Sequence, residues 1–191
     1  MSARNVVLAA AMLLPLAACS EETPPDWVSE ARARSAQLGS KLISALKDAL
    51  SEKGPSGGVR VCNVEAPEIA ERVSGDRFDV GRTALRVRNP ANAPDEWEES
   101  VLHRFEAQIK QGADPAGLQT WQIDTIDGER VGRYMKAIPM GPQCVVCHGE
   151  SIAPELAETI DRLYPEDQAT GFAPGELRGA FTITADLSQG D

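Results

Sequence analysis

The chain has 191 residues, of which 42% are hydrophobic and 25% are charged, and its formal net charge is −10 at pH 7. This length suits one domain with a sizeable core rather than two domains. The acidic balance, without a run rich in lysine and arginine, excludes a typical nucleic-acid-binding protein.

The N-terminus resembles the signal peptide of a bacterial lipoprotein. Arg4 supplies a positive charge, and 6–16 is an apolar run too short to span a bilayer, which needs roughly 20 residues. The run closes on Leu-Ala-Ala-Cys, so we predict a signal peptide over 1–18, acylation of Cys19 and a polar tether over 19–26. The expected location is the periplasmic side of a bacterial membrane, where the lipid anchors the protein. Cleavage at an ordinary small-residue site is the alternative.

Helical periodicity dominates the first part of the predicted domain, 27–191. Apolar residues spaced by three and four predict a helix over 27–51, at Val28, Ala31, Leu38, Leu42, Leu46 and Ala49. The Gly- and Pro-rich segment 53–58 ends this helix. A short extended run over 59–62 and a short helix over 66–71 are expected to follow.

Alternation of polar and apolar residues then predicts a strand over 79–89. Its basic residues share one face, and these are Arg82, Arg86 and Arg88. Asp95 is expected to cap a helix that ends at Gly112. This helix carries its apolar residues at Trp97, Val101, Phe105 and Ile109.

The second half of the chain reads mainly as antiparallel strands. Strands over 120–126 and 130–138 flank an Asp-Gly pair, which is a strong signal for a two-residue hairpin turn. A helix over 154–163 and a last strand over 178–185 complete the pattern. These elements predict an α+β fold in a single domain, with one sheet that carries its helices on one side.

A five-residue motif lies in a Gly- and Pro-rich loop after the predicted hairpin: Cys144-Val145-Val146-Cys147-His148. Two thiols at this spacing can form thioether bonds to the two vinyl groups of one porphyrin, and the following histidine can ligate the iron. We therefore predict one covalently attached haem c, bound by Cys144 and Cys147, with His148 as an axial ligand. A redox-active CxxC pair, half of a zinc site with Cys62, and a structural disulfide are the alternatives.

Several short motifs along the chain carry a resemblance to a known family. They are Val61-Cys62-Asn63, Ala66-Pro67, Gly81-Arg82-Thr83, Arg86, Arg88-Asn89-Pro90, Asn92, Trp97-Glu98, Ile138-Pro139, Cys144 to Gly149, Tyr164-Pro165, Asp167, Gly171 and Arg178-Gly179-Ala180. Over 27–187 the chain resembles the PAS-like, c-type haem-binding domain of cyanobacterial and proteobacterial proteins. That domain was long a domain of unknown function, and it is also the input region of some sensor kinases. The resemblance implies a PAS-like antiparallel sheet with flanking helices. Two departures are Ala84, where the family usually has serine, and the lack of a kinase output region.

The second axial position of the iron has four candidate ligands, which are Cys62, His103, Met135 and Met140. The resemblance implies Cys62, which is also the one thiol left unassigned and lies just before a helix N-terminus that favours thiolate. A buried free cysteine that only packs is the alternative for this residue. His103 is expected on the surface, Met135 in the core of a strand, and Met140 beside the porphyrin.

The three arginines of the predicted strand form a basic face on an acidic protein. Arginine binds carboxylates through two parallel hydrogen bonds, so we predict that Arg82, Arg86 and Arg88 supply partners for the haem propionates. A solvated strand face is the alternative. Five aromatic residues could wall the haem pocket or pack in the core, namely Trp97, Trp121, Tyr134, Phe172 and Phe181.

Ligation by His148 and Cys62 predicts a low reduction potential, because thiolate donates electron density and stabilises ferric iron. We expect one-electron transfer to or from a redox partner protein in the periplasm or the membrane. The alternative is a haem-based sensor, in which a change of redox state or a gas that displaces Cys62 is read by a partner protein. An enzyme such as a peroxidase is not expected, because His103 is the one candidate for a distal acid or base.

Overall fold

The computed structural model describes residues 23–188, so the predicted signal peptide over 1–18 and the acylation site Cys19 lie outside the described residues. The helices are α1 (Asp26–Arg60), α2 (Ala66–Ser74), α3 (Glu96–Lys110), α4 (Val145–His148) and α5 (Pro154–Leu163), with a π-helical turn at Val61–Glu65. The strands are β1 (Phe78–Thr83), β2 (Gln119–Ile126), β3 (Glu129–Pro139) and β4 (Leu177–Asp186). Short 3₁₀ turns lie at Pro90–Asn92, Pro115–Gly117 and Pro142–Cys144. Within 23–188, none of the helices is long and apolar enough to cross a membrane.

The four strands form one antiparallel sheet in the order β1-β4-β3-β2. β2 and β3 are joined by a two-residue turn, in which Asp127 and Gly128 have φ angles of 53° and 86°. Left-handed conformations at both turn residues match the twist of the flanking strands, so the predicted hairpin is confirmed. The α+β, PAS-like fold predicted from the sequence is also confirmed.

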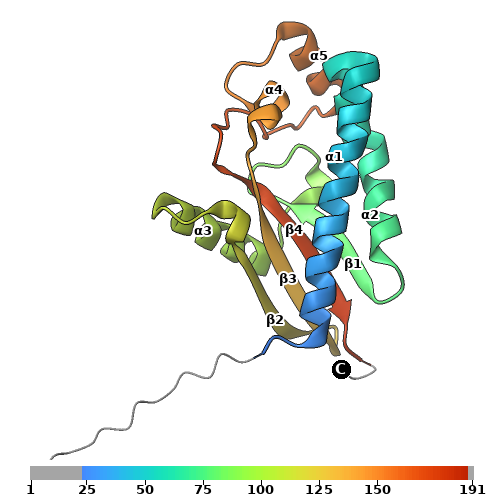
Figure 1. Cartoon of the computed structure of the whole chain (residues 1–191), viewed down its shortest axis with the longest axis vertical. Helices are drawn as coiled ribbons and strands as arrows, with labels where there is room; N and C mark the ends of the chain where they lie inside the picture. Colours follow the sequence, from blue (N-terminus) through green and yellow to red (C-terminus); the bar gives the residue numbers. More distant parts are fainter. Residues whose placement is uncertain (1–22, 189–191) are drawn as a thin grey trace, which may run out of the picture.

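Helices cover both faces of this sheet (Figure 1). α1 and α2 pack on one face, where Tyr134 of β3 and Ile183 of β4 are buried. α3 packs on the other face, against Met135 of β3 and Ala180 of β4. Successive residues of a strand point to opposite faces, so Tyr134 and Met135 mark the two sides. The expectation of helices on one side only is wrong, because each face of the sheet contributes buried apolar residues to a core of its own.

α1 is longer than predicted and carries a kink. Its backbone leaves helical geometry at Gly54, where φ is 64° and ψ is −166°, and the helix restarts at Pro55. Proline is well tolerated in the first turn of a helical segment, because its missing N–H would lack a partner there anyway. The restarted segment buries Val59 against α5. The predicted extended run over 59–62 is therefore wrong, since these residues finish α1 and enter the π-helical turn.

β1 is shorter than predicted and ends at Thr83, six residues before Asn89. Its last pairing partner in β4 is Ala180, and the neighbouring Gly179 has a φ of 159°. A Cβ atom at Gly179 would lie 2.4 Å from the carbonyl oxygen of Thr83, so the two backbones approach closely at the point where the pairing of β1 with β4 ends. Arg86 and Arg88 follow in an irregular segment. The prediction that they share a strand face with Arg82 is wrong.

α3 begins at Asp95 as predicted and is fastened to the sheet at that end. The Asp95 carboxylate accepts from the Glu98 backbone N–H at 2.9 Å, and the Glu98 carboxylate accepts from the Asp95 N–H at 3.1 Å. This reciprocal capping box satisfies two orphan donors of the first turn. Arg133 of β3 donates to Asp95 and lies over the ring of Trp97, 4.3 Å from its centroid. A buried arginine of the sheet is thus paired with carboxylates at the start of α3.

Candidate functional site

The CxxCH motif lies at the end of the molecule where β3 leaves the sheet, drawn at the top of Figure 1. The backbone of Met140 anchors this exit, because its N–H donates to Glu176 and its carbonyl accepts from Gly175, at 2.8 and 2.9 Å. The motif itself is a 3₁₀ turn followed by the single-turn helix α4, rather than a loop. Residues three apart on a helical turn share one side. This geometry therefore brings Cys144 and Cys147 to the same side of the turn.

The two motif cysteines pack against two different small clusters. Cys147 contacts the cluster of Val59, Leu156, Ile160 and Tyr164, which joins α1 to α5. Cys144 contacts the cluster of Met140, Ala169 and Phe172. Both thiols are free and half-buried, and burial raises the pKa of Cys147.

His148 is held in one orientation by the segment that follows α5. Its Nδ1 lies 2.7 Å from the carbonyl oxygen of Ala169, and because a carbonyl only accepts, Nδ1 carries the proton. The Nε2 lone pair is then free to bind a metal. Burial, followed by the charges of Arg178 and Arg88, lowers the pKa of His148 to about 3, so the imidazole is neutral. Phe172 meets the ring edge-on, with centroids 6.4 Å apart.

Arg88 ties the motif to this same segment. Its Nη2 donates to the carbonyl of Cys147 at 2.6 Å, to the carboxylate of Asp167 at 2.9 Å and to the carbonyl of Ala169 at 3.3 Å. Its side chain is 8% exposed and that of Asp167 is 6% exposed, so the pair is a buried ion pair. Arg88 therefore supports the backbone at Cys147 and at Ala169, on both sides of His148, and does not lie on the strand predicted for it.

Cys62 lies in the π-helical turn that joins α1 to α2. It is half-buried, and Val59, three residues earlier, packs in the cluster that Cys147 contacts, which places this turn beside the motif. Single π-helical turns within helices are frequent at functional sites. The structure thus brings Cys62 next to the CxxCH motif across the long sequence separation.

The other candidate ligands lie elsewhere. His103 on α3 is 60% exposed and sits between Glu99 and Glu106, at 3.8 and 3.7 Å. Met135 is fully buried in the core under α3, as expected for a strand residue. Met140 is buried beneath the motif, in contact with the cluster that holds Cys144.

The sequence alone did not identify four residues of the site. They are Asp167, Ala169, Arg178 and Phe172, the last in its role as a contact of His148. Ala169 acts through its carbonyl group, and no side-chain pattern reports the direction of a carbonyl. Asp167 and Arg178 occur in the motifs that carry the family resemblance, which is the signal that could have found them. Their roles depend on the fold, since they come from two segments that meet only at this end of the sheet.

The donor set fits a covalently attached haem. Two free thiols lie one helical turn apart, the adjacent imidazole is neutral and has a free Nε2, and a third thiol lies beside them. Within residues 23–188, no three His, Cys, Asp or Glu side chains cluster as direct ligands of a metal ion. His148 and Cys62 supply one donor each, which is what the two axial positions of a porphyrin-bound iron require.

The chain is similar to known proteins over most of its length. The sequence profile of the Tll0287-like family matches residues 12–185, a range that includes Cys62 and the whole motif. Among solved structures, the crystal structure of the cyanobacterial heme-protein Tll0287 has a TM-score of 0.63 to this chain and is 25% identical in sequence. The match covers 88% of this chain and 100% of that one. No curated protein matches the chain.

Proposed function

Because the chain belongs to the Tll0287-like family, we propose that it is a monohaem c-type cytochrome, with its haem attached through Cys144 and Cys147 and ligated by His148. The observation that carries the proposal is the 2.7 Å hydrogen bond between His148 Nδ1 and the Ala169 carbonyl. This bond selects the tautomer with a free Nε2 and orients the ring before any metal is bound. A histidine that only packs in a core would need neither a fixed tautomer nor two free thiols beside it.

Cys62 is the proposed second axial ligand. It is presented by the π-helical turn beside Cys147, whereas His103 and Met135 lie on and under α3, away from the motif. A thiolate ligand stabilises ferric iron, so the pair of His148 and Cys62 gives a low reduction potential.

The proposed role is one-electron transfer on the periplasmic side of a bacterial membrane, with Cys19 as the lipid-bearing residue. When bound, a haem supplies the one-electron ferric–ferrous couple, and the chain supplies the ligands and the surrounding charges. The partner is a redox protein of the periplasm or membrane. We propose no catalytic activity of its own, because His103 lies away from the motif and offers no acid or base there.

The test is a comparison of absorption and EPR spectra of the wild type and Cys62→Ala, produced in a host with the c-haem maturation machinery. The wild type should be six-coordinate and low-spin, and Cys62→Ala should lose the thiolate signature. Met140→Leu is the matched control, since Met140 is buried beneath the motif and should leave the spectra unchanged. Identical spectra of the wild type and Cys62→Ala would end the assignment of Cys62.

A haem-based sensor is the second candidate, favoured by the position of Cys62 between α1 and α2. Loss of the proposed bond between Cys62 and the iron would act directly on α1, which packs along the sheet. Rapid binding of CO or NO to the reduced protein, altered in Cys62→Ala, would support sensing. Fast reversible reduction without ligand exchange would support electron transfer.

A further inference from the structure

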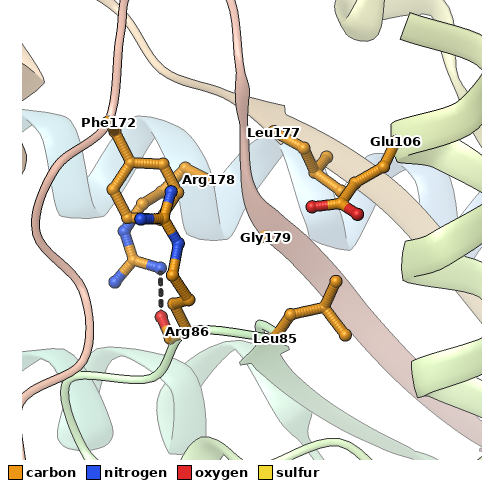
Figure 2. Close-up of a pocket in the computed structure, with 7 residues that line it drawn as sticks. All are labelled: Leu85, Arg86, Glu106, Phe172, Leu177, Arg178 and Gly179. Atoms are coloured by element: carbon orange, nitrogen blue, oxygen red, sulfur yellow. Dashed lines mark hydrogen bonds between the residues drawn. The ribbon is translucent and has the colours of Figure 1, made fainter. Parts of the chain in front are cut away.

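Arg178, the second residue of β4, is a half-buried arginine without a carboxylate partner. Its Nη1 donates to the carbonyl of Arg86 at 3.2 Å, and its guanidinium lies 5.4 Å from the ring centroid of Phe172 (Figure 2). Among residues 23–188, no carboxylate lies within ion-pair distance of Arg178. Glu106, which lines the same small hollow, makes no ion pair with it. The charge of Arg178 is therefore not neutralised by the protein.

Positive charge accumulates around this residue. The charged and titratable groups that act on Arg178 come from four segments and are Arg82, Arg88, Asp167 and Cys62. Burial, and then the repulsion from Arg88 and Arg82, lowers the pKa of Arg178 to about 10. The carboxylate of Asp167 is already bound by Arg88, and Arg82 has no ion pair among the described residues. Among the described residues, neither Arg82 nor Arg178 therefore makes an ion pair with a carboxylate.

A second buried arginine, in the sheet, shows how this protein neutralises an arginine that has only a structural role. Arg133 is buried to a similar degree as Arg88 and is paired with Asp95 and with Glu98. Clustered cations that lack such partners cost free energy unless an anion binds between them. The cluster around Arg178 therefore has the charge of an anion-binding site, and it lies beside Phe172, whose ring meets that of His148 edge-on.

We propose that Arg178, together with Arg82, binds the propionate carboxylates of the haem. This inference rests on the proposed function and revises the arginines expected from the sequence. Two unpaired cations match the two propionates of one haem, and a guanidinium binds a carboxylate through two parallel hydrogen bonds. Arg88 and Arg86 are engaged elsewhere. Arg88 holds Asp167, while the exposed Arg86 lies over Phe172 at 3.6 Å, donates to Thr170 and faces Glu176 at 3.9 Å.

The first test is the pH dependence of the reduction potential in Arg178→Gln. A nearby cation favours the ionised carboxylate, so its removal should raise the propionate pKa by at least about one unit, a tenfold weaker acid. The bend in the plot of potential against pH should move up accordingly. Arg178→Lys should retain most of the wild-type profile. Arg86 lies over the same Phe172 ring but outside the cluster, so Arg86→Gln should not move the profile. Coincident profiles for Arg178→Gln and the wild type would overturn the inference.

The second test compares unfolding temperatures with and without haem, using the full chain produced in hosts with and without the maturation machinery. Arg178→Gln should lower the midpoint of the loaded protein but leave that of the unloaded protein equal or higher, because an uncompensated repulsion is removed. An equal fall in both forms would mean a structural role and would overturn the inference. An Arg178-dependent stabilisation of the loaded protein by inorganic phosphate would assign the site to a free anion instead. Absence of covalent haem in every variant would refute the proposed function, a separate outcome from these.

Discussion

The sheet body and the end that carries the motif are built differently. We call the sheet body the two cores that cover both sheet faces, under α1 and α2 on one side and α3 on the other. We call the motif end residues 142–172 together with Arg88 and Arg178, which lie against them, and here the apolar residues form two small clusters instead of one core. Most of the hydrophobic stabilisation must come from the larger cores, because it scales with the apolar area removed from water.

The two regions also treat charge differently. In the sheet body, Arg133 is bound by Asp95 and faces Glu98, so each buried charge has a partner. At the motif end, Arg178 has no carboxylate partner, and the free thiols of Cys144 and Cys147 lie nearby. The buried charge of the sheet body is thus balanced within the protein, whereas the motif end has the free thiols and the unpaired arginine that the proposed haem would engage.

The largest expected effect on the unfolding free energy comes from a cavity in the sheet body. Phe105→Ala removes a buried ring from the core under α3 and should cost about 3–5 kcal/mol of unfolding free energy. Urea denaturation should give the same loss with and without haem, because the Phe105 ring belongs to neither of the two clusters that contact the motif cysteines. Ile123→Ala, at an exposed strand position, is the control and should stay within about 0.5 kcal/mol. A loss of unfolding free energy for Phe105→Ala that appears only in the loaded protein would mean that this core depends on the haem, contrary to the difference drawn between the two regions.

Next in size is the loss of the buried ion pair at the motif end. Arg88→Met leaves Asp167 without its cation and should cost roughly 3 kcal/mol, at the lower end for buried pairs because Asp167 keeps the N–H of Ala169 at 2.8 Å. The double variant Arg88→Met/Asp167→Leu should recover part of this loss in chemical denaturation. Strictly additive losses would show that the two side chains are not coupled.

A smaller effect is expected from one hydroxyl in the sheet body. Tyr134 donates to Gln119 at 2.8 Å, and Gln119 also accepts from Arg32 at 3.0 Å. Tyr134→Phe should therefore cost about 1 kcal/mol or less, since Gln119 keeps a second donor. A calorimetric loss several times larger would mean that the hydroxyl organises more of the core than this one bond.

The smallest effect concerns pH. Burial acts to raise the pKa of Asp95, but the hydrogen bonds from the Glu98 N–H and from Arg133 outweigh it and hold the pKa below 3.8. A lowered carboxyl pKa adds stability that is present above the unfolded value of about 3.9 and is lost as the pH falls through the folded value. Asp95→Asn keeps a good cap, so it should cost less than about 1 kcal/mol at pH 7. The difference from the wild type should vanish in acid-denaturation curves at low pH, and a difference that grows there would contradict the assignment.

Local patterns predicted the elements whose signals lie within a few residues. The Asp127-Gly128 turn, the cap at Asp95 and the helix over 154–163 all appear where their sequence signals place them. The CxxCH spacing likewise identified the centre of the site. These features need no knowledge of distant segments.

The errors arose where a distant segment decides the outcome. β1 stops at Thr83, where Gly179, far along the chain, lies against the Thr83 carbonyl. The run 59–62 is helical because Val59 packs on α5. In the same way, Arg178 comes near Arg82 only through the pairing of β4 with β1, so a strand pattern read along the sequence named Arg82, Arg86 and Arg88 for the propionates and could not include Arg178.

The central claim is a haem bound covalently by Cys144 and Cys147 and ligated by His148, and intact-protein mass spectrometry after denaturing extraction tests it most directly. Protein from a host with the c-haem maturation machinery should carry the added mass of one haem, and the double variant Cys144→Ser/Cys147→Ser should not. A wild-type protein of unmodified mass, expressed beside a control cytochrome that is fully loaded, would contradict the account.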